Sequence, residues 1–207
     1  MLHYAFDAFL AREFPSVDFE RYADDAVIHC VTERQAREVR AALQQRLSSL
    51  GLELHPDKTR IVYCQDDDRR GAFEHTSFTF LGYTFAPRAA TGRGGKPQVS
   101  FLPAVSNDAL ARMSGRLHHW TTHTLDQLAD WINPVVRGWM NYYGRFRRSA
   151  LFPLLQRINT YLMRWAGRKH KRLRSYKRFK AWWFGILDRD PELFAHWRWV
   201  RTFAGLR

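Results

Sequence analysis

The sequence predicts an α+β first half, residues 1–102, followed by an all-α second half, residues 103–207. Short β-rich runs alternate with amphipathic helices before Pro103, whereas after it the apolar residues recur only at helical spacing. The charge changes at nearly the same point. Residues 1–100 hold 13 Lys+Arg and 14 Asp+Glu, and residues 101–207 hold 20 and 6 together with all eight tryptophans. We therefore expect two modules with different roles.

The first half is predicted to begin with a short amphipathic helix that ends before Pro15. Apolar-biased runs at 17–22 and 26–31 flank Ala23-Asp24-Asp25, a tight acidic turn typical of two antiparallel strands. Thr32 and Gln35 have the spacing of a capping box, and an apolar helical stripe follows until Gly51. The order so far is helix, β-hairpin, helix.

More strands are expected before the boundary at Pro103. Residues 58–64 form a β-rich run, and residues 78–85 outline another strand that is interrupted at Leu81-Gly82. The Gly- and Arg-rich segment 91–96 is predicted to be a hinge or a hairpin tip before the run at 99–102.

Four helices are predicted in the second half. They begin after Ser106, after a capping box made by Thr124 and Gln127, near residue 151 and near residue 175. Pro134 is expected to bend the second of them. We expect four tryptophans on the apolar stripes to be core residues: Trp120, Trp131, Trp139 and Trp165.

Composition limits the classes of function. A formal net charge of +13 indicates a polyanionic partner, nucleic acid first and an anionic membrane surface second. With 45% hydrophobic residues, disorder is a poor interpretation. No apolar run approaches the ~18 residues of a membrane span, so we expect a cytoplasmic protein without a membrane partner. Cys30 and Cys64 indicate neither a disulfide framework nor a cysteine zinc site.

The acidic turn is the strongest candidate for chemistry. Adjacent carboxylates raise each other's pKa unless a cation neutralises them, and Mg²⁺ accepts one or two protein carboxylates together with water and substrate phosphates. Asp24 and Asp25 are therefore candidate catalytic and metal-binding residues of a two-metal phosphoryl-transfer site. An ordinary hairpin turn is the alternative, because Asp is a common turn residue.

Four segments, in order, resemble one family. Residues 21–25 (RYADD) resemble the active-site hairpin of reverse transcriptases. Residues 51–59 (GLELHPDKT) and 80–85 (FLGYTF) resemble the palm turn and the primer-grip hairpin of group II intron reverse transcriptases, and residues 131–143 (WINPVVRGWMNYY) resemble the signature of their maturase domain. The resemblance implies a partial palm over 1–102, with a thumb and an RNA-binding maturase domain over 103–207.

The resemblance also implies roles for individual residues. Tyr22 and Ala23 would shape the floor beneath the primer end, and Lys58 would lie near the nucleotide phosphates, with an ordinary surface lysine as the alternative. The turn of Leu81, Gly82 and Tyr83 would position the primer, with a plain strand bend as the alternative. Group II intron RNA, an RNA template and a DNA primer are the implied partners.

Part of the polymerase site is expected to be missing. Enzymes of this family use a further aspartate from an earlier palm strand and a fingers region, and nothing before Tyr22 supplies either. Asp7 falls on the first helix and Asp18 on the hairpin's own first strand. We therefore expect the C-terminal half of a reverse transcriptase and maturase, with an incomplete Mg²⁺ site and no polymerase activity of its own unless a separate chain supplies the rest.

The second half interleaves cations with aromatics, a pattern that suits RNA because cations contact phosphates and aromatic rings stack on unpaired bases. A solvated cationic surface is the alternative. The predicted RNA-binding residues are Arg137, Tyr142, Tyr143, Arg145, Arg147, Arg148, Arg164, Arg168, Lys169, Lys171, Arg172, Arg174, Lys177 and Arg178.

Other chemistry has little support in the sequence. His118, His119 and His123 have no partner residues that would complete a zinc site, and the segment 92–95 lacks the lysine and hydroxyl of a phosphate-binding loop. Two hypotheses remain open. The chain is part of an RNA-directed DNA polymerase and maturase, or it is a non-catalytic RNA-binding protein that assists group II intron folding and splicing.

Overall fold

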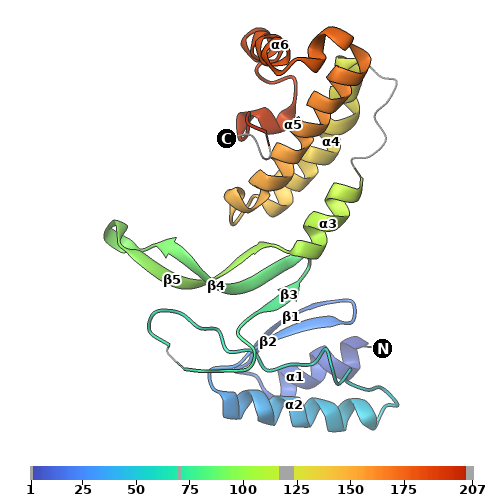
Figure 1. Cartoon of the computed structure of the whole chain (residues 1–207). Helices are drawn as coiled ribbons and strands as arrows, with labels where there is room; N and C mark the ends of the chain where they lie inside the picture. The colour runs from blue at the N-terminus through green and yellow to red at the C-terminus, as the bar shows by residue number, and fades with distance from the viewer. Residues whose placement is uncertain (1, 70, 117–123, 204–207) are drawn as a thin grey trace. The chain divides into compact units, whose positions relative to one another are not determined.

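The computed structural model describes residues 2–69, 71–116 and 124–203 and divides into two units (Figure 1). The first unit comprises Met1–Phe80 and Ala86–Phe101, and the second, here called the helical unit, comprises Leu81–Phe85 and Leu102–Arg207. Leu81–Phe85 therefore groups with the helices, although its place in the sequence predicts that it belongs to the first module. The mixed helix and sheet content, with helices as the regular structure of the described residues after 105, confirms the predicted fold class.

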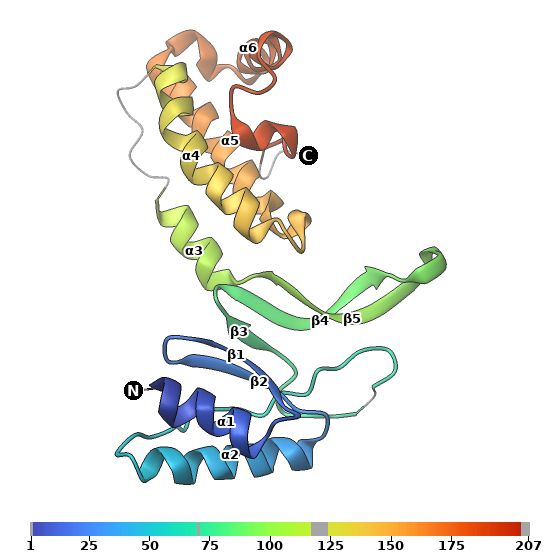
Figure 2. The same cartoon turned by 180° about the vertical axis from the view of Figure 1, so that it is seen from behind.

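A β-hairpin and two helical segments form the body of the first unit. The chain runs through η1 (His3–Asp7), α1 (Ala8–Glu13), β1 (Asp18–Tyr22), β2 (Asp25–His29) and α2 (Glu33–Ser48). The helices lie on one side of the hairpin (Figures 1 and 2). Apolar residues of η1, α1 and α2 pack there against Phe19 and Ile28 of the hairpin; their buried core is Phe6, Leu10, Val17, Val39 and Leu43.

Helix α2 begins with a variant of the predicted capping box. The Thr32 hydroxyl accepts a hydrogen bond from the Gln35 backbone N–H at 3.1 Å. The Gln35 side chain reaches back one residue further than the motif requires, because its Oε1 accepts from the N–H of Val31 at 2.8 Å. Gly51, with a φ of 72°, follows the end of the helix as predicted.

The strand predicted over residues 58–64 is wrong, because residues 59–69 and 71–77 contain neither strand nor helix. The backbone N–H of Tyr63 donates to His75 O at 2.9 Å, but this bond is not continued into a ladder. A segment of β-rich composition forms a strand only where a neighbouring strand pairs with it through a continuous ladder of backbone hydrogen bonds. This segment lacks such a neighbour among the described residues.

Three strands form the second sheet, in the order β3-β4-β5: β3 (Phe78–Phe80), β4 (Tyr83–Thr91) and β5 (Pro97–Val105). The interruption at Leu81-Gly82 is a two-residue turn in which both residues have positive φ, 50° and 79°. Such turns match the twist of a hairpin. The segment around η2 (Arg93–Gly95) is a hairpin tip, and both β4 and β5 pass through the two units.

The helical unit contains α3 (Asn107–Gly115), α4 (Leu125–Tyr143), α5 (Phe152–Lys169) and α6 (Tyr176–Arg189), with short 3₁₀ segments η3 (Arg148–Leu151), η4 (Lys171–Arg174) and η5 (Ala195–Arg198). The predicted caps are confirmed: Ser106 accepts from Ala109 N, and Thr124 and Gln127 form a full capping box. Helices α4 and α5 lie side by side (Figures 1 and 2). Pro134 lies inside α4, which continues through it. None of the helices described has the length and apolar character needed to cross a membrane.

Tryptophans occupy both the core and the surface of this unit. Trp165 is buried as predicted, and so are Trp183 and Trp197, each 1% exposed. The core prediction for Trp131 is wrong, because this side chain is 53% exposed on the outer face of α4. Trp139 is partly buried against the core, and Trp120 lies outside the described residues.

Candidate functional site

The predicted acidic turn is a two-residue hairpin loop. Strands β1 and β2 pair antiparallel from Asp18↔His29 to Tyr22↔Asp25, so Ala23 and Asp24 form the loop and Asp25 begins the second strand. Ala23 has a φ of 53°, in the left-handed region that an alanine rarely adopts. A backbone held in this region needs local contacts that fix it.

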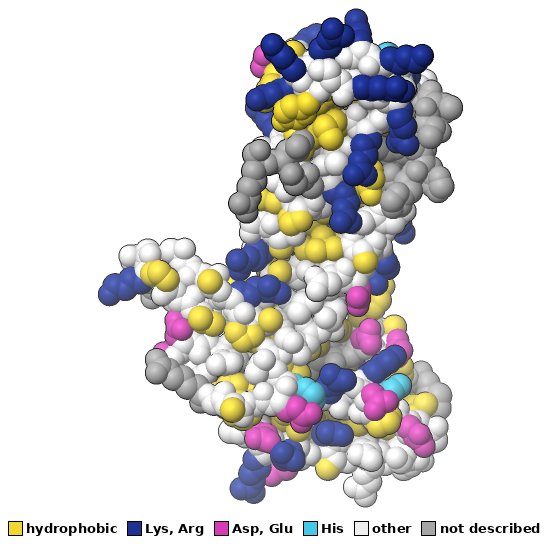
Figure 3. Space-filling model, viewed as in Figure 1, with side chains coloured by type: hydrophobic (Ala, Val, Ile, Leu, Met, Phe, Trp, Pro, Cys, Tyr) yellow, Lys and Arg dark blue, Asp and Glu magenta, His cyan; other side chains and the backbone are white. Residues whose placement is uncertain are grey.

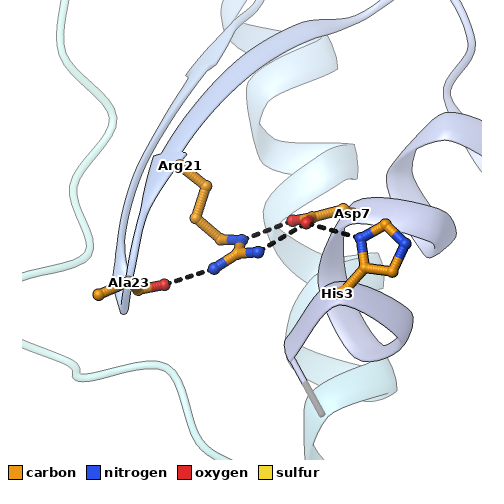
Figure 4. A network of polar contacts seen from close by, with 4 residues as sticks. All are labelled: His3, Asp7, Arg21 and Ala23. Carbon is orange, nitrogen blue, oxygen red and sulfur yellow. Dashed lines mark hydrogen bonds and ion pairs between the residues drawn. The ribbon is translucent and has the colours of Figure 1, made fainter.

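Arg21 supplies such contacts at the base of the loop (Figure 4). Its Nη1 donates to the carbonyl oxygen of Ala23 at 2.7 Å, and its Nε and Nη2 donate to the two carboxylate oxygens of Asp7, each at 2.6 Å. His3 Nδ1 also lies 3.1 Å from Asp7 Oδ2. The hydrogen bonds from Arg21 hold the pKa of the Asp7 carboxyl below its ordinary value. The loop is therefore tied to the first helical segment.

The Arg21–Asp7 pair was not predicted from the sequence. The sequence suggests for Asp7 only the role of a further metal ligand, for which its position on the first helix makes it unsuitable. The signal available in the sequence was an arginine directly before the acidic turn, but nothing in the spacing of residues 7 and 21 shows that they meet.

The two candidate carboxylates face solvent. Asp24 and Asp25 are exposed, as is Tyr22 at 65%, and neither carboxylate forms an ion pair with any residue that the structure describes. Oxygen ligands of this kind suit Mg²⁺, which binds through one or two carboxylates and keeps several waters. Among residues 2–69, 71–116 and 124–203, no three Asp, Glu, His or Cys side chains gather around a common point. The pair therefore fits part of a metal site, with two ligands.

Lys58 lies on the exposed turn 56–58, and its backbone N–H donates to His55 O at 3.3 Å. The Leu81-Gly82-Tyr83 turn belongs to the other unit. The structure thus brings Tyr22, Ala23, Asp24 and Asp25 together on one hairpin, whereas Lys58 lies on a different segment of the same unit.

The Leu81-Gly82-Tyr83 turn contacts the end of α4. The Tyr142 hydroxyl donates to Leu81 O at 2.9 Å, and the Tyr83 hydroxyl donates to Tyr142 O. Tyr83 is 7% exposed, with its ring centroid 5.2 Å from that of Tyr142 and 5.3 Å from that of Tyr143. Burial, chiefly, raises the pKa of Tyr83 to about 12. Two residues predicted to bind RNA therefore contact the turn predicted to position a primer.

Most of the predicted RNA-binding cations are exposed on the helical unit. They come from α4, the segment after it, the end of α5, η4 and the start of α6. Figure 3 shows Lys and Arg side chains gathered over the part of this unit that carries α6 and the end of α5. Within that cluster Leu173 and Phe179 are buried, at 5% and 1%, and anchor the segment to the core.

The cluster, here called the basic cluster, is defined by Arg168, Lys169, Lys171, Arg172, Arg174, Lys177, Arg178 and Lys180. Apart from Lys169, none of its members forms an ion pair with a carboxylate in the described part of the chain. Some cations pack on rings of their own unit instead. Lys169 Nζ lies 5.3 Å from the Trp165 ring, and the Arg148 guanidinium lies 5.3 Å from the Trp199 ring.

Buried polar residues hold the C-terminal segment against α4 and α5. Asn133, within the maturase-like segment, donates to Leu193 O at 2.8 Å and accepts from Ala195 N at 2.8 Å. Asn159 Oδ1 accepts from Trp197 Nε1 at 3.1 Å and lies 2.7 Å from His196 Nε2. Burial lowers the pKa of His196 to about 3, so this imidazole is neutral at neutral pH. These residues are structural.

The histidines for which the sequence suggests little support as zinc ligands, His118, His119 and His123, lie outside the described residues.

Comparison with known families finds two profiles that match separate parts of the chain. The profile of the reverse transcriptase (RNA-dependent DNA polymerase) family matches residues 1–85. The profile of the group II intron maturase-specific domain matches residues 109–183, which include α4, α5 and the basic cluster. No curated protein and no solved structure matches the chain significantly. The chain thus carries, in this order, a reverse transcriptase region and a group II intron maturase-specific domain, which together support a group II intron reverse transcriptase and maturase.

Proposed function

We propose that the chain binds group II intron RNA through the basic cluster and the cations around the end of α4. The observation that carries this proposal is the imbalance of charge: residues 101–207 hold 20 Lys+Arg and 6 Asp+Glu, and the exposed cluster has almost no carboxylate partners within the described chain. Like charges at this density repel one another unless a polyanion neutralises them. RNA phosphates supply that charge.

Two kinds of contact are expected at this surface. The cations of the basic cluster would contact phosphates, which fixes the position of the RNA without reading its sequence. Exposed aromatic rings within the cluster and just after it, such as Tyr176 at 51% and Phe184 at 48%, offer faces on which unpaired bases can stack. The occupant would therefore be a folded RNA with both helical and unpaired parts.

In the first unit, Asp24 and Asp25 would hold Mg²⁺ for RNA-directed DNA synthesis on an RNA template and a DNA primer. Support comes from the two exposed carboxylates at a hairpin loop fixed by Arg21, which have no ion-pair partner among the described residues, and from the reverse transcriptase match over this region. Bound metal would stabilise the charge that develops during phosphoryl transfer. Because the described residues offer only two ligands, a further carboxylate would have to come from a separate chain or segment.

Salt dependence tests the RNA-binding proposal. Binding of a labelled group II intron RNA is measured by filter binding between about 50 and 300 mM KCl, a range over which the screening of charges changes strongly. The wild type is compared with the triple variant Lys171→Gln, Arg172→Gln and Arg174→Gln. If these residues bind phosphates, the log–log salt slope should fall by about 0.7–0.9 for each phosphate that the variant no longer neutralises. Equal slopes for the two proteins would contradict the proposal.

The first unit offers a matched control. The triple variant Arg34→Gln, Arg37→Gln and Arg40→Gln removes the same number of exposed arginine or lysine charges from α2, where Arg34 and Arg37 already pair with Glu38 and Glu33. Its slope should remain close to that of the wild type. An equal decrease in both triple variants would indicate a non-specific effect of net charge.

The second candidate function is non-catalytic RNA binding that assists intron folding and splicing. The two-ligand carboxylate pair favours it, because a polymerase site requires more metal ligands than these described residues provide. Intron binding that survives Asp24→Ala with Asp25→Ala supports the binding function, and primer extension with Mg²⁺ tests the enzymatic one. We expect no extension by the purified chain alone. Robust product that Asp24→Asn abolishes would overturn that expectation.

A further inference from the structure

We infer that Tyr142 is a positioning residue that holds the Leu81-Gly82-Tyr83 turn, and that this turn contacts an RNA–DNA primer–template duplex only while Tyr142 holds it. The inference rests on the proposed function, since it assumes that the chain binds nucleic acid. It assigns Tyr142 a role that differs from base stacking, which its exposure and its position among arginines would suggest.

Reciprocal hydrogen bonds join the turn to the end of α4. The Tyr142 hydroxyl donates to Leu81 O at 2.9 Å, and in return the Tyr83 hydroxyl donates to Tyr142 O. The last carbonyls of a helix have no partner within it, so the Tyr83 hydroxyl satisfies one that the ladder of α4 leaves open. Both the hydroxyl and the carbonyl oxygen of Tyr142 therefore bind the turn.

The turn requires this support because of its backbone. Leu81 and Gly82 both have positive φ, which has a steric cost for Leu81. Gly82 packs against Tyr143, since a Cβ added to Gly82 would lie 2.7 Å from the Tyr143 hydroxyl oxygen. On the other side, the Ser106 N–H donates to Gly82 O at 2.9 Å, directly before α3. The turn is thus held between the start of α3 and the end of α4.

Helix α4 also carries the predicted RNA-binding residue Arg137, and Arg145 follows its end. A shift of this end would change the same hydrogen bonds that hold Leu81 and Tyr83.

The test compares Tyr142→Phe with the wild type in the full chain. This substitution keeps the aromatic ring and removes only the hydroxyl that donates to Leu81 O. We expect amide hydrogen exchange at Ser106 to become about fivefold faster, the effect of removing one hydrogen bond. Affinity for an RNA–DNA primer–template duplex should fall by roughly the same factor, while affinity for intron RNA without a primer stays unchanged.

Two further variants keep the test decisive. Gly82→Ala should give the same two changes, because its Cβ meets Tyr143 and its φ of 79° disfavours alanine. Tyr4→Phe, at an exposed tyrosine of the first unit (74%), serves as the matched control and should change neither quantity.

The outcomes separate this inference from the proposed function. If Tyr142→Phe behaves as the wild type and only Tyr142→Ala weakens intron RNA binding, Tyr142 is a stacking residue and the inference is overturned. Faster exchange at Ser106 with unchanged duplex affinity also overturns it, since the turn would then be structural only. In either case, intact salt-dependent binding of intron RNA would leave the proposed function standing.

Discussion

The two units differ in whether their cationic side chains form ion pairs with carboxylates. In the first unit, arginines pair with carboxylates of the same unit: Arg21 with Asp7, Arg34 with Glu38 and Arg37 with Glu33. In the helical unit, the exposed basic cluster forms few ion pairs with carboxylates of the described chain. Two of its lysines, Lys169 and Lys180, lie over aromatic rings instead. The first unit is therefore nearly neutral on its own surface, whereas the helical unit keeps its positive charge available for a polyanion.

Their cores differ as well. The first unit has a small core beneath one hairpin, while the helical unit encloses a larger set of buried residues that includes Trp165, Trp183 and Trp197. Because all eight tryptophans lie in residues 101–207, tryptophan emission reports on the helical unit alone, and far-ultraviolet circular dichroism reports on both. This difference makes it possible to test the two units separately within one intact chain.

The largest expected effect is on the core of the helical unit. Trp183→Ala removes a ring that is 1% exposed and contacts Trp197 at 4.8 Å between centroids, and should lower the free energy of unfolding by about 3–5 kcal/mol. Urea denaturation followed by tryptophan emission measures it. Trp131→Ala, at 53% exposure, is the matched control and should cost no more than about 0.5 kcal/mol. Equal decreases would refute the division into buried and exposed tryptophans.

Acid should destabilise the helical unit before the first unit. His196 is neutral when folded, with its pKa lowered from 6.5 to about 3, but gains a proton on unfolding below pH 6.5. The unfolded state then binds more protons, so stability falls as the pH drops from 6.5 towards 3, by up to about 1.4 kcal/mol per pH unit. Denaturation midpoints from tryptophan emission at pH 7, 6, 5 and 4 measure this decrease.

His196→Gln should remove most of this acid sensitivity, although it also lowers stability at pH 7 because Gln does not fill the same site. The exposed His55→Gln serves as the control and should leave the pH profile unchanged. A wild-type midpoint that stays constant between pH 6.5 and 4 would contradict the burial of a neutral His196.

A smaller effect is expected from Asp7→Asn in the first unit. The change removes a carboxylate that accepts two hydrogen bonds from Arg21, and should cost about 1–3 kcal/mol, as for hydrogen bonds to charged groups. Circular dichroism should record it, while the transition seen by tryptophan emission should stay in place. In the wild type, the stability that the lowered pKa of Asp7 provides is present above pH 3.8 and lost as the pH falls through the folded value.

The smallest effect is expected on the surface of α2. Glu38→Gln removes an exposed i, i+4 ion pair with Arg34 at 2.9 Å and should cost only about 0.2–0.5 kcal/mol. The same circular dichroism melts measure it, with 1 M KCl as the control condition, under which the difference from the wild type should vanish. A larger decrease that persists in salt would show that surface pairs contribute more to the first unit than we expect.

Local signals in the sequence predicted local structure well. The caps at Thr32, Ser106 and Thr124 were read from short spacings, and each hydroxyl accepts a backbone N–H as expected. The acidic hairpin was equally accessible, because a strand, a two-residue loop and a second strand are all set within a dozen residues. In each case the interacting groups lie close together in the chain.

Features that depend on distant residues were missed. The run at 58–64 has the composition of a strand but no neighbouring strand in the described chain. Trp131 lies at the edge of the apolar stripe predicted from the sequence, but the buried face of α4 includes Ala129 and Asn133 and is turned away from Trp131. The contacts of Asp7 with Arg21 and of Asn159 with His196 join residues 14 and 37 positions apart, and neither sequence spacing nor composition indicates them.

The grouping of Leu81–Phe85 with the helices affects where an expression fragment of the helical unit should begin. An expression fragment that starts at Pro103 would lack Tyr83, the donor to Tyr142 O, and would uncover the rings of Tyr142, Tyr143 and Phe146 that surround it. Such a fragment should be prone to aggregation, because three aromatic side chains would be newly exposed at one place. A start upstream of Leu81 retains the missing piece, so the useful cloning limit lies more than twenty residues before the apparent boundary in the sequence.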